Sequence, residues 1–135
     1  MYLIDTNIWL ELLLNQEKAE EVRQFNKRIE GHLLAITEIS LYSIGVVLSR
    51  LKRDDAFLDF LSDTIEDTAV VRIRLGLNDL KKIIPLKQEL KLDFDDTYQY
   101  LAAEKFGYTL VSYDKDFDKT ERKRVTTKQV LETLK

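Results

Sequence analysis

Four acidic residues stand at positions where they could act together in catalysis: Asp5, Glu38, Asp96 and Asp114. The first directly follows the apolar segment 2–4, and the second and fourth each come two residues after similar segments, at 33–36 and 109–112. The third begins a helical segment. If the apolar segments are neighbouring parallel strands, the acids converge at one edge of the sheet, where ligands bind in α/β proteins. Such like charges raise one another's pKa unless a cation lies between them. The pattern therefore predicts a site for a hard divalent cation such as Mg²⁺.

Each of these acids also fits an ordinary structural role. Asp5 stands where an N-cap would begin a helix, and Asp114 could occupy a turn. Asp96, with Gln99 three residues later, resembles a capping box. These roles explain each acid taken singly, but they do not explain why several acids gather at one end of a sheet.

The composition narrows the chemistry further. The 135 residues include no cysteine, which excludes disulfides, thiolate zinc sites and a cysteine nucleophile. The single histidine, His32, disfavours histidine metal clusters and a histidine-centred triad. The 21 lysine and arginine residues against 24 acidic residues give a formal charge of −3, so the basic excess typical of nucleic-acid binders is missing. Any metal must be held by oxygen.

The elements that position the acids alternate along the chain. Short apolar segments predict strands at 2–4, 33–36, 69–73 and 109–112. The spacing of apolar residues predicts helices at 8–14, 16–30, 38–52, 56–65, 77–90 and 96–105. Gly31 and Gly107 should end two of these helices, and Pro85 should kink one or start a new turn. This order predicts an α/β fold whose parallel sheet is covered on both faces.

The chain carries no sign of a division or of a targeting segment. Its length suits one domain spanning 1–135, and no proline- or glycine-rich linker interrupts it. Neither a signal-like N-terminus nor an apolar run of about 20 residues is present. We therefore expect a single cytoplasmic domain without a membrane partner.

Four motifs together carry a family resemblance. They read IDTN at 4–7, TEIS at 37–40, Asp96 followed by alanines at 102–103 and a glycine at 107, and LVSYDKDF at 110–117. With these motifs in this order, the chain resembles a PIN-domain ribonuclease of the kind that serves as the VapC toxin of type II toxin–antitoxin systems. The resemblance covers nearly the whole chain. It implies a three-layer α/β/α fold with a short central parallel sheet of four to five strands.

The resemblance also implies a role for each site residue. Asp5, Glu38, Asp96 and Asp114 match the four acidic active-site positions, and Asp116 matches an auxiliary acid. Asp5 and Asp96 resemble the principal metal ligands, with Asp114 as a further ligand or, with Glu38, a group that positions the attacking water. Thr6, Asn7 and Ser112 would support these acids. The alanine at 103, seven residues after Asp96, favours Asp96 over Asp95, although a shared role stays open. Thr97 and Ser112 depart from the family, which usually has alanine and threonine there.

The function that the resemblance implies is hydrolysis of RNA phosphodiester bonds with Mg²⁺ or Mn²⁺. RNA of the tRNA or rRNA class would be the substrate, an antitoxin protein the partner, and a homodimer the assembly. A non-catalytic PIN-like module that binds RNA or protein is the main alternative. A receiver domain fits less well, because the strand at 69–73 leads into Arg72 and Arg74 rather than a phosphoacceptor aspartate. An aspartyl-nucleophile phosphatase would need a second aspartate where Asn7 stands.

Two further segments allow a structural and a functional interpretation. Basic residues follow the last acidic motif and could form a solvated surface or a rim that contacts RNA phosphates: Lys115, Lys119, Arg122, Lys123 and Arg124. Trp9 and the leucines at 10 and 12–14 belong mainly to the core, with a groove for an antitoxin helix or a dimer contact as the alternative. If five acids surround a cation, 19 acidic residues remain against 21 basic ones, and the net charge no longer argues against RNA.

Overall fold

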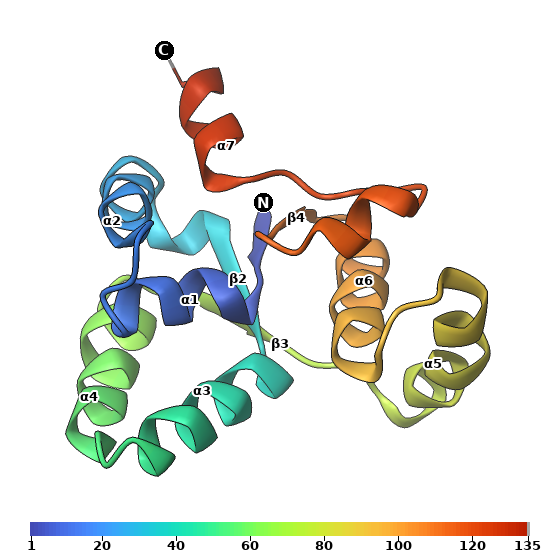
Figure 1. The fold of residues 1–135 in the computed structure, drawn as a ribbon, viewed down its shortest axis with the longest axis horizontal. Helices are drawn as coiled ribbons and strands as arrows, with labels where there is room; N and C mark the ends of the chain where they lie inside the picture. Colours follow the sequence, from blue (N-terminus) through green and yellow to red (C-terminus); the bar gives the residue numbers. More distant parts are fainter. Residues whose placement is uncertain (135) are drawn as a thin grey trace.

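The computed structural model describes residues 1–134 and has a four-stranded parallel sheet at its centre (Figure 1). The strands are β1 (Tyr2–Ile4), β2 (Leu34–Thr37), β3 (Val71–Ile73) and β4 (Thr109–Val111). Their order is β3-β2-β1-β4, and every pair is parallel. Leu3 of β1 therefore lies opposite Ala35 of β2 and Leu110 of β4. The predicted α/β fold with four to five parallel strands is confirmed.

Neighbouring residues of each strand enter different hydrophobic cores, because side chains alternate between the two faces of a sheet. Leu3 and Leu110 pack in one core, whereas Ile4 and Val111 pack in the other. All four side chains are at most 4% exposed. Both faces of the sheet are thus buried, which requires a layer of helices on each side.

The face that includes Ile4 is covered by five helical segments of the N-terminal half and by the last helix. These are α1 (Thr6–Leu13), α2 (Ala19–Arg28), α3 (Glu38–Arg50), α4 (Asp54–Asp59), the π-helical segment η2 (Phe60–Glu66) and α7 (Thr127–Thr133). Trp9 of α1 is fully buried and meets Phe60 edge to face, with ring centroids 5.4 Å apart. The leucines that follow Trp9 pack against this core while staying partly exposed. The predicted core role of α1 is therefore confirmed.

The opposite face is covered by α5 (Leu77–Leu90), α6 (Phe94–Phe106) and the short 3₁₀ helix η3 (Lys115–Lys119). α6 lies between the sheet and α5 in Figure 1. It is consequently buried along most of its length, from Thr97 to Ala103. Pro85 lies inside α5 without ending it. The three layers place the start of α6 beside the carboxyl ends of β1 and β4.

The second predicted helix differs from the observed one at both ends. α2 begins at Ala19 rather than 16, and it ends with Ile29 in an extended conformation. The prediction that Gly31 ends this helix is wrong, because Gly31 starts the 3₁₀ helix η1 (Gly31–Leu33) instead. A Cβ atom at Gly31 would lie 1.9 Å from the carbonyl oxygen of Thr68. Close approach of the backbone, not helix capping, requires glycine here, whereas Gly107 does end α6 with φ of +71°.

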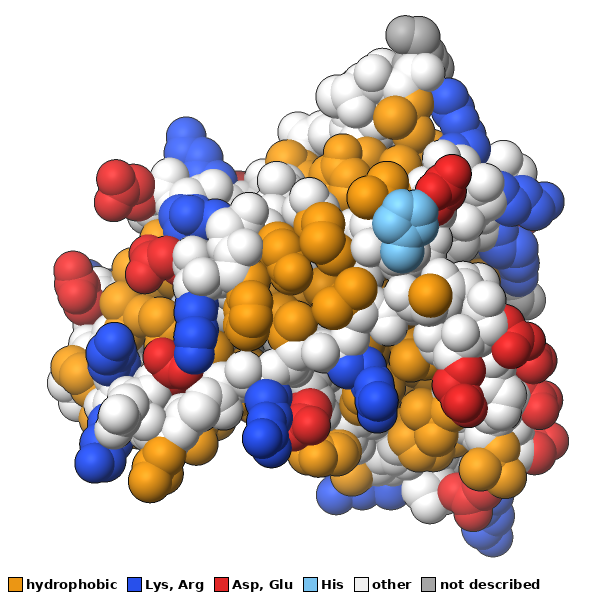
Figure 2. Space-filling view, turned by 180° about the vertical axis from the view of Figure 1, so that it is seen from behind, with side chains coloured by type: hydrophobic (Ala, Val, Ile, Leu, Met, Phe, Trp, Pro, Cys, Tyr) orange, Lys and Arg blue, Asp and Glu red, His pale blue; other side chains and the backbone are white. Residues whose placement is uncertain are grey.

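Apolar side chains are also left on the surface. Tyr42 and Val46 of α3 and Leu77 and Ile84 of α5 are each about half exposed or more. Figure 2 shows hydrophobic side chains gathered on the reverse face, with lysine and arginine side chains around them. Within residues 1–134, no helix combines the length and the hydropathy needed to cross a membrane.

Candidate active site

The carboxyl ends of β1 and β4 and the start of α6 surround one cleft of about 240 Å³. Its lining is rich in acidic and polar side chains: Asp5, Thr6, Asn7, Leu10, Ile39, Ser43, Asp93, Asp95, Asp96, Gln99 and Asp114. Ile39 and Ser43 come from α3, which follows β2 directly. Because β1 is flanked by β2 and β4, residues distant in sequence meet at this edge. Three of the four predicted acids lie here.

Asp5 is the innermost acid and is only 5% exposed. It is the N-cap of α1, and its Oδ1 accepts a hydrogen bond from the Thr6 backbone N–H at 2.8 Å. Gln99 Nε2 also donates to Oδ1, at 2.9 Å, and Ser112 Oγ donates to Oδ2 at 2.6 Å. Burial raises the pKa of Asp5, the three hydrogen bonds oppose this, and the charge of Asp114 raises it further. Asp5 thus serves as a helix cap and as a cleft residue at the same time.

Asp96 has a different position from the one that a capping box would give it. The N-cap of α6 is Asp93, whose Oδ1 accepts a hydrogen bond from the Asp96 backbone N–H at 2.9 Å. The interpretation of Asp96 and Gln99 as a capping box is therefore wrong. Partial burial, a hydrogen bond with Asp114 and the negative charges of Asp114, Asp93 and Asp5 raise the pKa of Asp96 to about 8. The Asp96 side chain is left available to the cleft.

Asp114 and Asp116 complete a cluster of acids. The Asp116 backbone N–H donates to Asp114 Oδ1 at 2.9 Å, so Asp114 caps η3 as its predicted turn role requires. One carboxylate oxygen each from Asp96, Asp114 and Asp116 lies within 4.8 Å of the others. Among residues 1–134, no lysine or arginine forms an ion pair with Asp5 or with any of these three acids.

The chemistry of this cluster fits a hard divalent cation. All of the side-chain atoms that it offers to a metal are carboxylate oxygens, the ligands that Mg²⁺ and Mn²⁺ prefer. Carboxylates this close, partly buried and unpaired with basic side chains in the described chain, repel one another. A bound cation would remove that repulsion, which makes Asp96, Asp114 and Asp116 candidates for its ligands. Asp5 lines the same cleft and is a further candidate.

A model of the PIN domain family matches residues 2–123. The chain belongs to the PIN domain family. The predicted family resemblance is confirmed, and so is the three-layer fold that it implied. Comparison with curated protein sequences gives no significant match.

Solved structures with this PIN fold include proteins of toxin–antitoxin systems. A toxin–antitoxin complex from Klebsiella pneumoniae matches at a TM-score of 0.74 and 22% identity, over 94% of this chain and 98% of that one. VapC20 of Mycobacterium tuberculosis, a toxin that cleaves the sarcin-ricin loop, matches at a TM-score of 0.75 and 13% identity, over 90% of this chain and 95% of that one. FitAcB of Neisseria gonorrhoeae matches at a TM-score of 0.70 and 16% identity, over 93% of this chain and 96% of that one. At these identities the likeness establishes a common fold.

The predicted supporting residues of this PIN domain hold the cleft in different ways. The Thr6 hydroxyl bonds Ser40 Oγ at 2.7 Å, so Thr6 contacts Asp5 through its backbone N–H. Asn7 Nδ2 donates to Ser112 Oγ at 3.3 Å, and Asn7 Oδ1 accepts from the Tyr113 backbone N–H at 3.2 Å. Ser112 is fully buried, donates to Asp5 and accepts from the Asp114 backbone N–H at 3.0 Å. Asn7 therefore acts on Asp5 through Ser112.

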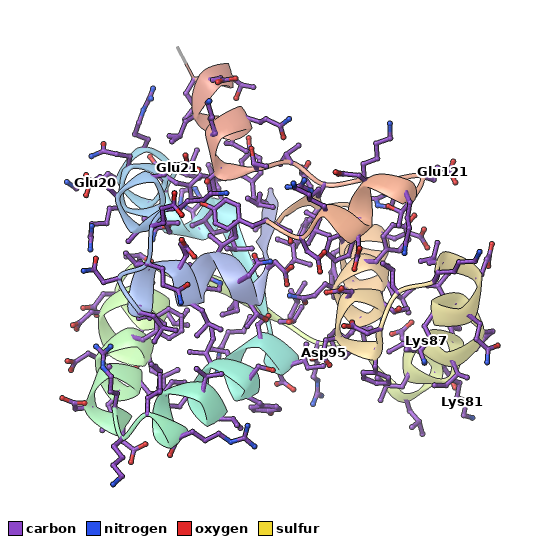
Figure 3. All side chains as sticks on the ribbon, viewed as in Figure 1. Glu20, Glu21, Lys81, Lys87, Asp95 and Glu121 are labelled. Carbon is purple, nitrogen blue, oxygen red and sulfur yellow. The ribbon has the colours of Figure 1, made fainter. Side chains whose placement is uncertain are left out.

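Glu38 and Asp95 lie at the margin of the site. Within residues 1–134, the lining of the cleft includes Asp5, Asp96 and Asp114 but not Glu38. Glu38 begins α3, is half-buried, and its Oε2 accepts a hydrogen bond from the Tyr42 hydroxyl at 3.5 Å. Asp95 is exposed at the start of α6, where Figure 3 labels it, and contributes to the cleft wall.

Sequence reasoning missed Asp93, Ser40 and Gln99 as parts of the site. Asp93 could have been found as an N-cap, because an aspartate is favoured at that position and Asp93 stands three residues before Asp96, close to the start of the predicted helix. Ser40 lies within the TEIS motif but carried no assigned role. Gln99 is 2% exposed and bonds residues far away in sequence, which no local pattern reveals.

The basic residues after the last acidic motif do not all face the cleft. Arg122 Nη2 donates to the carbonyl oxygen of Tyr108 at 3.1 Å, and Tyr108 precedes β4, at the end of the sheet opposite the cleft. Glu121, the residue before Arg122, lies near one end of α6 in Figure 3, and Asp95 lies at the other end. Other basic side chains of this segment are also used within the protein. Lys119 Nζ donates to Lys91 O at 2.7 Å, and Arg124 donates to Ser112 O and to both carboxylate oxygens of Asp118 at 3.0–3.1 Å. A phosphate-contacting rim stays a prediction, with the exposed Lys115, beside Asp114, best placed for it.

Proposed function

We propose that this PIN domain is a divalent-cation-dependent endoribonuclease and the toxin of a toxin–antitoxin pair. The observation that carries the proposal is the gathering of acids at the carboxyl end of the parallel sheet. Asp5, Asp96 and Asp114 line one cleft, and Asp116 joins Asp96 and Asp114 in a cluster. None of the four has an ion-pair partner in residues 1–134. Family membership supports nuclease activity, and the fold shared with toxin–antitoxin proteins supports the biological role.

Each acid would contribute to the reaction from a position that the protein fixes. Asp5, Asp96 and Asp114 would hold Mg²⁺ or Mn²⁺ between β1, α6 and β4. When bound, the cation would supply a water of lowered pKa and neutralise charge on the scissile phosphate. Ser112 holds Asp5, and the Asp116 N–H holds Asp114, so both carboxylates are oriented before RNA binds. Glu38, outside the cleft lining, would position the attacking water or complete a second site.

Cleavage of RNA tests the activity directly. The purified protein is incubated with total RNA and with isolated tRNA and rRNA, in Mg²⁺, in Mn²⁺ and in EDTA. We expect cleavage with either metal and none in EDTA. Asp5→Asn should abolish cleavage while the protein stays folded, and Asp95→Asn should keep it, because Asp95 is exposed at the rim. Full cleavage by Asp5→Asn or in excess EDTA would refute the assignment, and a protein that binds RNA without cutting it would be the non-catalytic module.

The antitoxin and the homodimer are separate parts of the proposal. Exposed apolar side chains, among them Tyr42 and Leu58 at 65% and 64%, offer surface for association. A small DNA-binding protein encoded immediately upstream would be the expected antitoxin. Co-expression of the two should yield a stable complex without ribonuclease activity, and light scattering of the free protein should give the mass of a dimer. Unchanged cleavage in the presence of that protein would reject it as the antitoxin.

A further inference from the structure

Gln99 places an uncharged amide in the middle of the acidic site. The side chain projects from the buried part of α6 and is only 2% exposed. A buried amide is costly unless its polar atoms are hydrogen-bonded. Here Nε2 donates to Asp5 Oδ1 at 2.9 Å and to Ser40 Oγ at 2.8 Å, while Oε1 accepts from Thr37 Oγ1 at 2.8 Å. Both N–H groups and the carbonyl oxygen are therefore used.

The orientation of this amide follows from its partners. Asp5 as a carboxylate can only accept hydrogen bonds, so the group facing Oδ1 must be the NH₂ of Gln99. The Thr37 hydroxyl, which accepts from the Ser40 backbone N–H, donates its proton to Oε1. Turning the amide over would place two oxygen atoms 2.9 Å apart at Asp5. The network thus fixes Gln99 as a donor to Asp5.

The bonds to Asp5 leave its two oxygens in different states. A carboxylate offers about four lone-pair positions, two on each oxygen. Among residues 1–134, Oδ1 already accepts from the Thr6 N–H and from Gln99, whereas Oδ2 accepts from Ser112 alone. The remaining position is therefore on Oδ2. Without Gln99, a position on Oδ1 would open as well, and the carboxylate could rotate or bind through both oxygens.

We propose that Gln99 is a positioning residue that restricts Asp5 to binding the divalent cation through Oδ2 alone. This inference rests on the proposed function, because it assumes that Asp5 binds a metal. Groups that orient a ligand from behind are worth about 10–100-fold in metal affinity. The structure supplies such a group in Gln99, and it is held in turn by Thr37 and Ser40.

Metal binding by Gln99→Met tests this role, with Mn²⁺ alone as the probe. Methionine has a similar length and shape but cannot donate to Asp5, so calorimetry should show Mn²⁺ affinity about 10–100-fold weaker. Thr127→Val is the matched control, because it removes a fully buried hydroxyl that bonds Tyr113 and Glu21 and leaves Gln99 and all three donors to Asp5 in place. Thermal unfolding should show that both variants are folded and less stable. Only Gln99→Met should lose Mn²⁺ affinity.

Two results would overturn the inference. Wild-type Mn²⁺ affinity in Gln99→Met, or an equal loss in Thr127→Val, would leave Gln99 a purely structural role. A crystal structure of the wild-type protein with Mn²⁺ provides an independent measurement that needs no variant to fold. We expect Asp5 Oδ2 on the metal and Gln99 Nε2 still on Oδ1, and coordination through both oxygens would contradict this. A wild-type protein that binds no Mn²⁺ would refute the proposed metal-dependent function itself, and Gln99 with it.

Discussion

Replacing Asp96 with asparagine should stabilise the metal-free protein while destroying its metal site. The pKa of Asp96 is raised to about 8 by burial and by the carboxylates of Asp114, Asp93 and Asp5. An acid whose pKa is higher in the folded than in the unfolded state stabilises the fold at low pH, and this contribution is lost as the pH rises towards the folded-state pKa. The wild-type protein without metal should therefore become less stable between about pH 4 and pH 8.

The size of the effect follows from the same change in pKa. A shift from 3.8 to about 8 would correspond to about 6 kcal/mol for a fully buried, unscreened group. Asp96 is partly exposed, and water screens its neighbours, so we expect on the order of 1–2 kcal/mol. In a domain of this size that raises the midpoint of thermal unfolding of Asp96→Asn by about 3–8 °C at pH 8. At pH 5 the wild-type carboxyl is largely protonated, and the difference should shrink.

Thermal unfolding at pH 5 and pH 8, in EDTA and in Mg²⁺, measures these effects together. Mg²⁺ at about 100 times its dissociation constant stabilises a protein by about 2.7 kcal/mol, so at pH 8 the wild type should overtake Asp96→Asn when Mg²⁺ is added. Asp95→Asn is the matched control, because it removes a charge at the exposed neighbouring position. If Asp96→Asn is less stable than the wild type in EDTA at pH 8, or if Asp95→Asn gains as much, the repulsion inferred for this cluster is wrong.

Three further predictions concern backbone packing, catalysis and RNA binding. Gly31→Ala should lower the free energy of unfolding by about 1–3 kcal/mol, because its Cβ would overlap the Thr68 carbonyl. Gly76→Ala should cost less, because the nearest atom to its Cβ would be 3.7 Å away, and equal midpoints of thermal unfolding for the two variants would contradict this. Glu38→Gln should slow RNA cleavage by about 10²-fold while keeping Mn²⁺ affinity, as expected for a group that acts on water from outside the cleft lining; a wild-type cleavage rate would remove Glu38 from the active site. Lys115→Gln should reduce the slope of log affinity for RNA against log salt concentration by about one, the value of one phosphate contact, and Arg122→Gln, at the other end of β4, should leave the slope unchanged. A reduced slope in Arg122→Gln but not in Lys115→Gln would place the RNA on the opposite edge of the sheet.

The sequence predicts most of the sheet because each strand is short, apolar and followed by a polar residue. Parallel pairing of β1 with β2 and β4 then brings Asp5 and Asp114 together without further information. Helix ends are harder to predict, because local pattern and tertiary contact compete there. Gly31 looked like a helix terminus, yet its place is set by Thr68, 37 residues away. α7 was not predicted, although Thr126 and Gln129 form a capping box that marks its start.

Buried polar contacts are the part of the site that local patterns do not contain. α6 is buried at every residue from Thr97 to Ala103, so helical periodicity singles out no inward face, and no local pattern shows that the side chain at 99 meets Asp5, 94 residues earlier. The same applies to Ser40, whose partners Thr6 and Gln99 come from the start of α1 and from α6. These contacts arise only after the strands pair. The acids could therefore be predicted from the sequence, whereas the groups that orient them could not.

Capping and metal binding need not be alternative roles for an aspartate at a strand end. Asp5 caps α1 through Oδ1 and keeps a free position on Oδ2, and Asp114 caps η3 through Oδ1. In both, the cap fixes the carboxylate and leaves acceptor capacity for a cation. At the start of α6 the two roles belong to different residues. Asp93 caps the helix, and the side chain of Asp96, one turn further on, lines the cleft. Asp96 is therefore partly buried among three other carboxylates, and its burial together with their charges raises its pKa to about 8. Asp96, whose carboxylate accepts no bond from a backbone N–H within residues 1–134, is thus an acid whose charge depends on a bound cation.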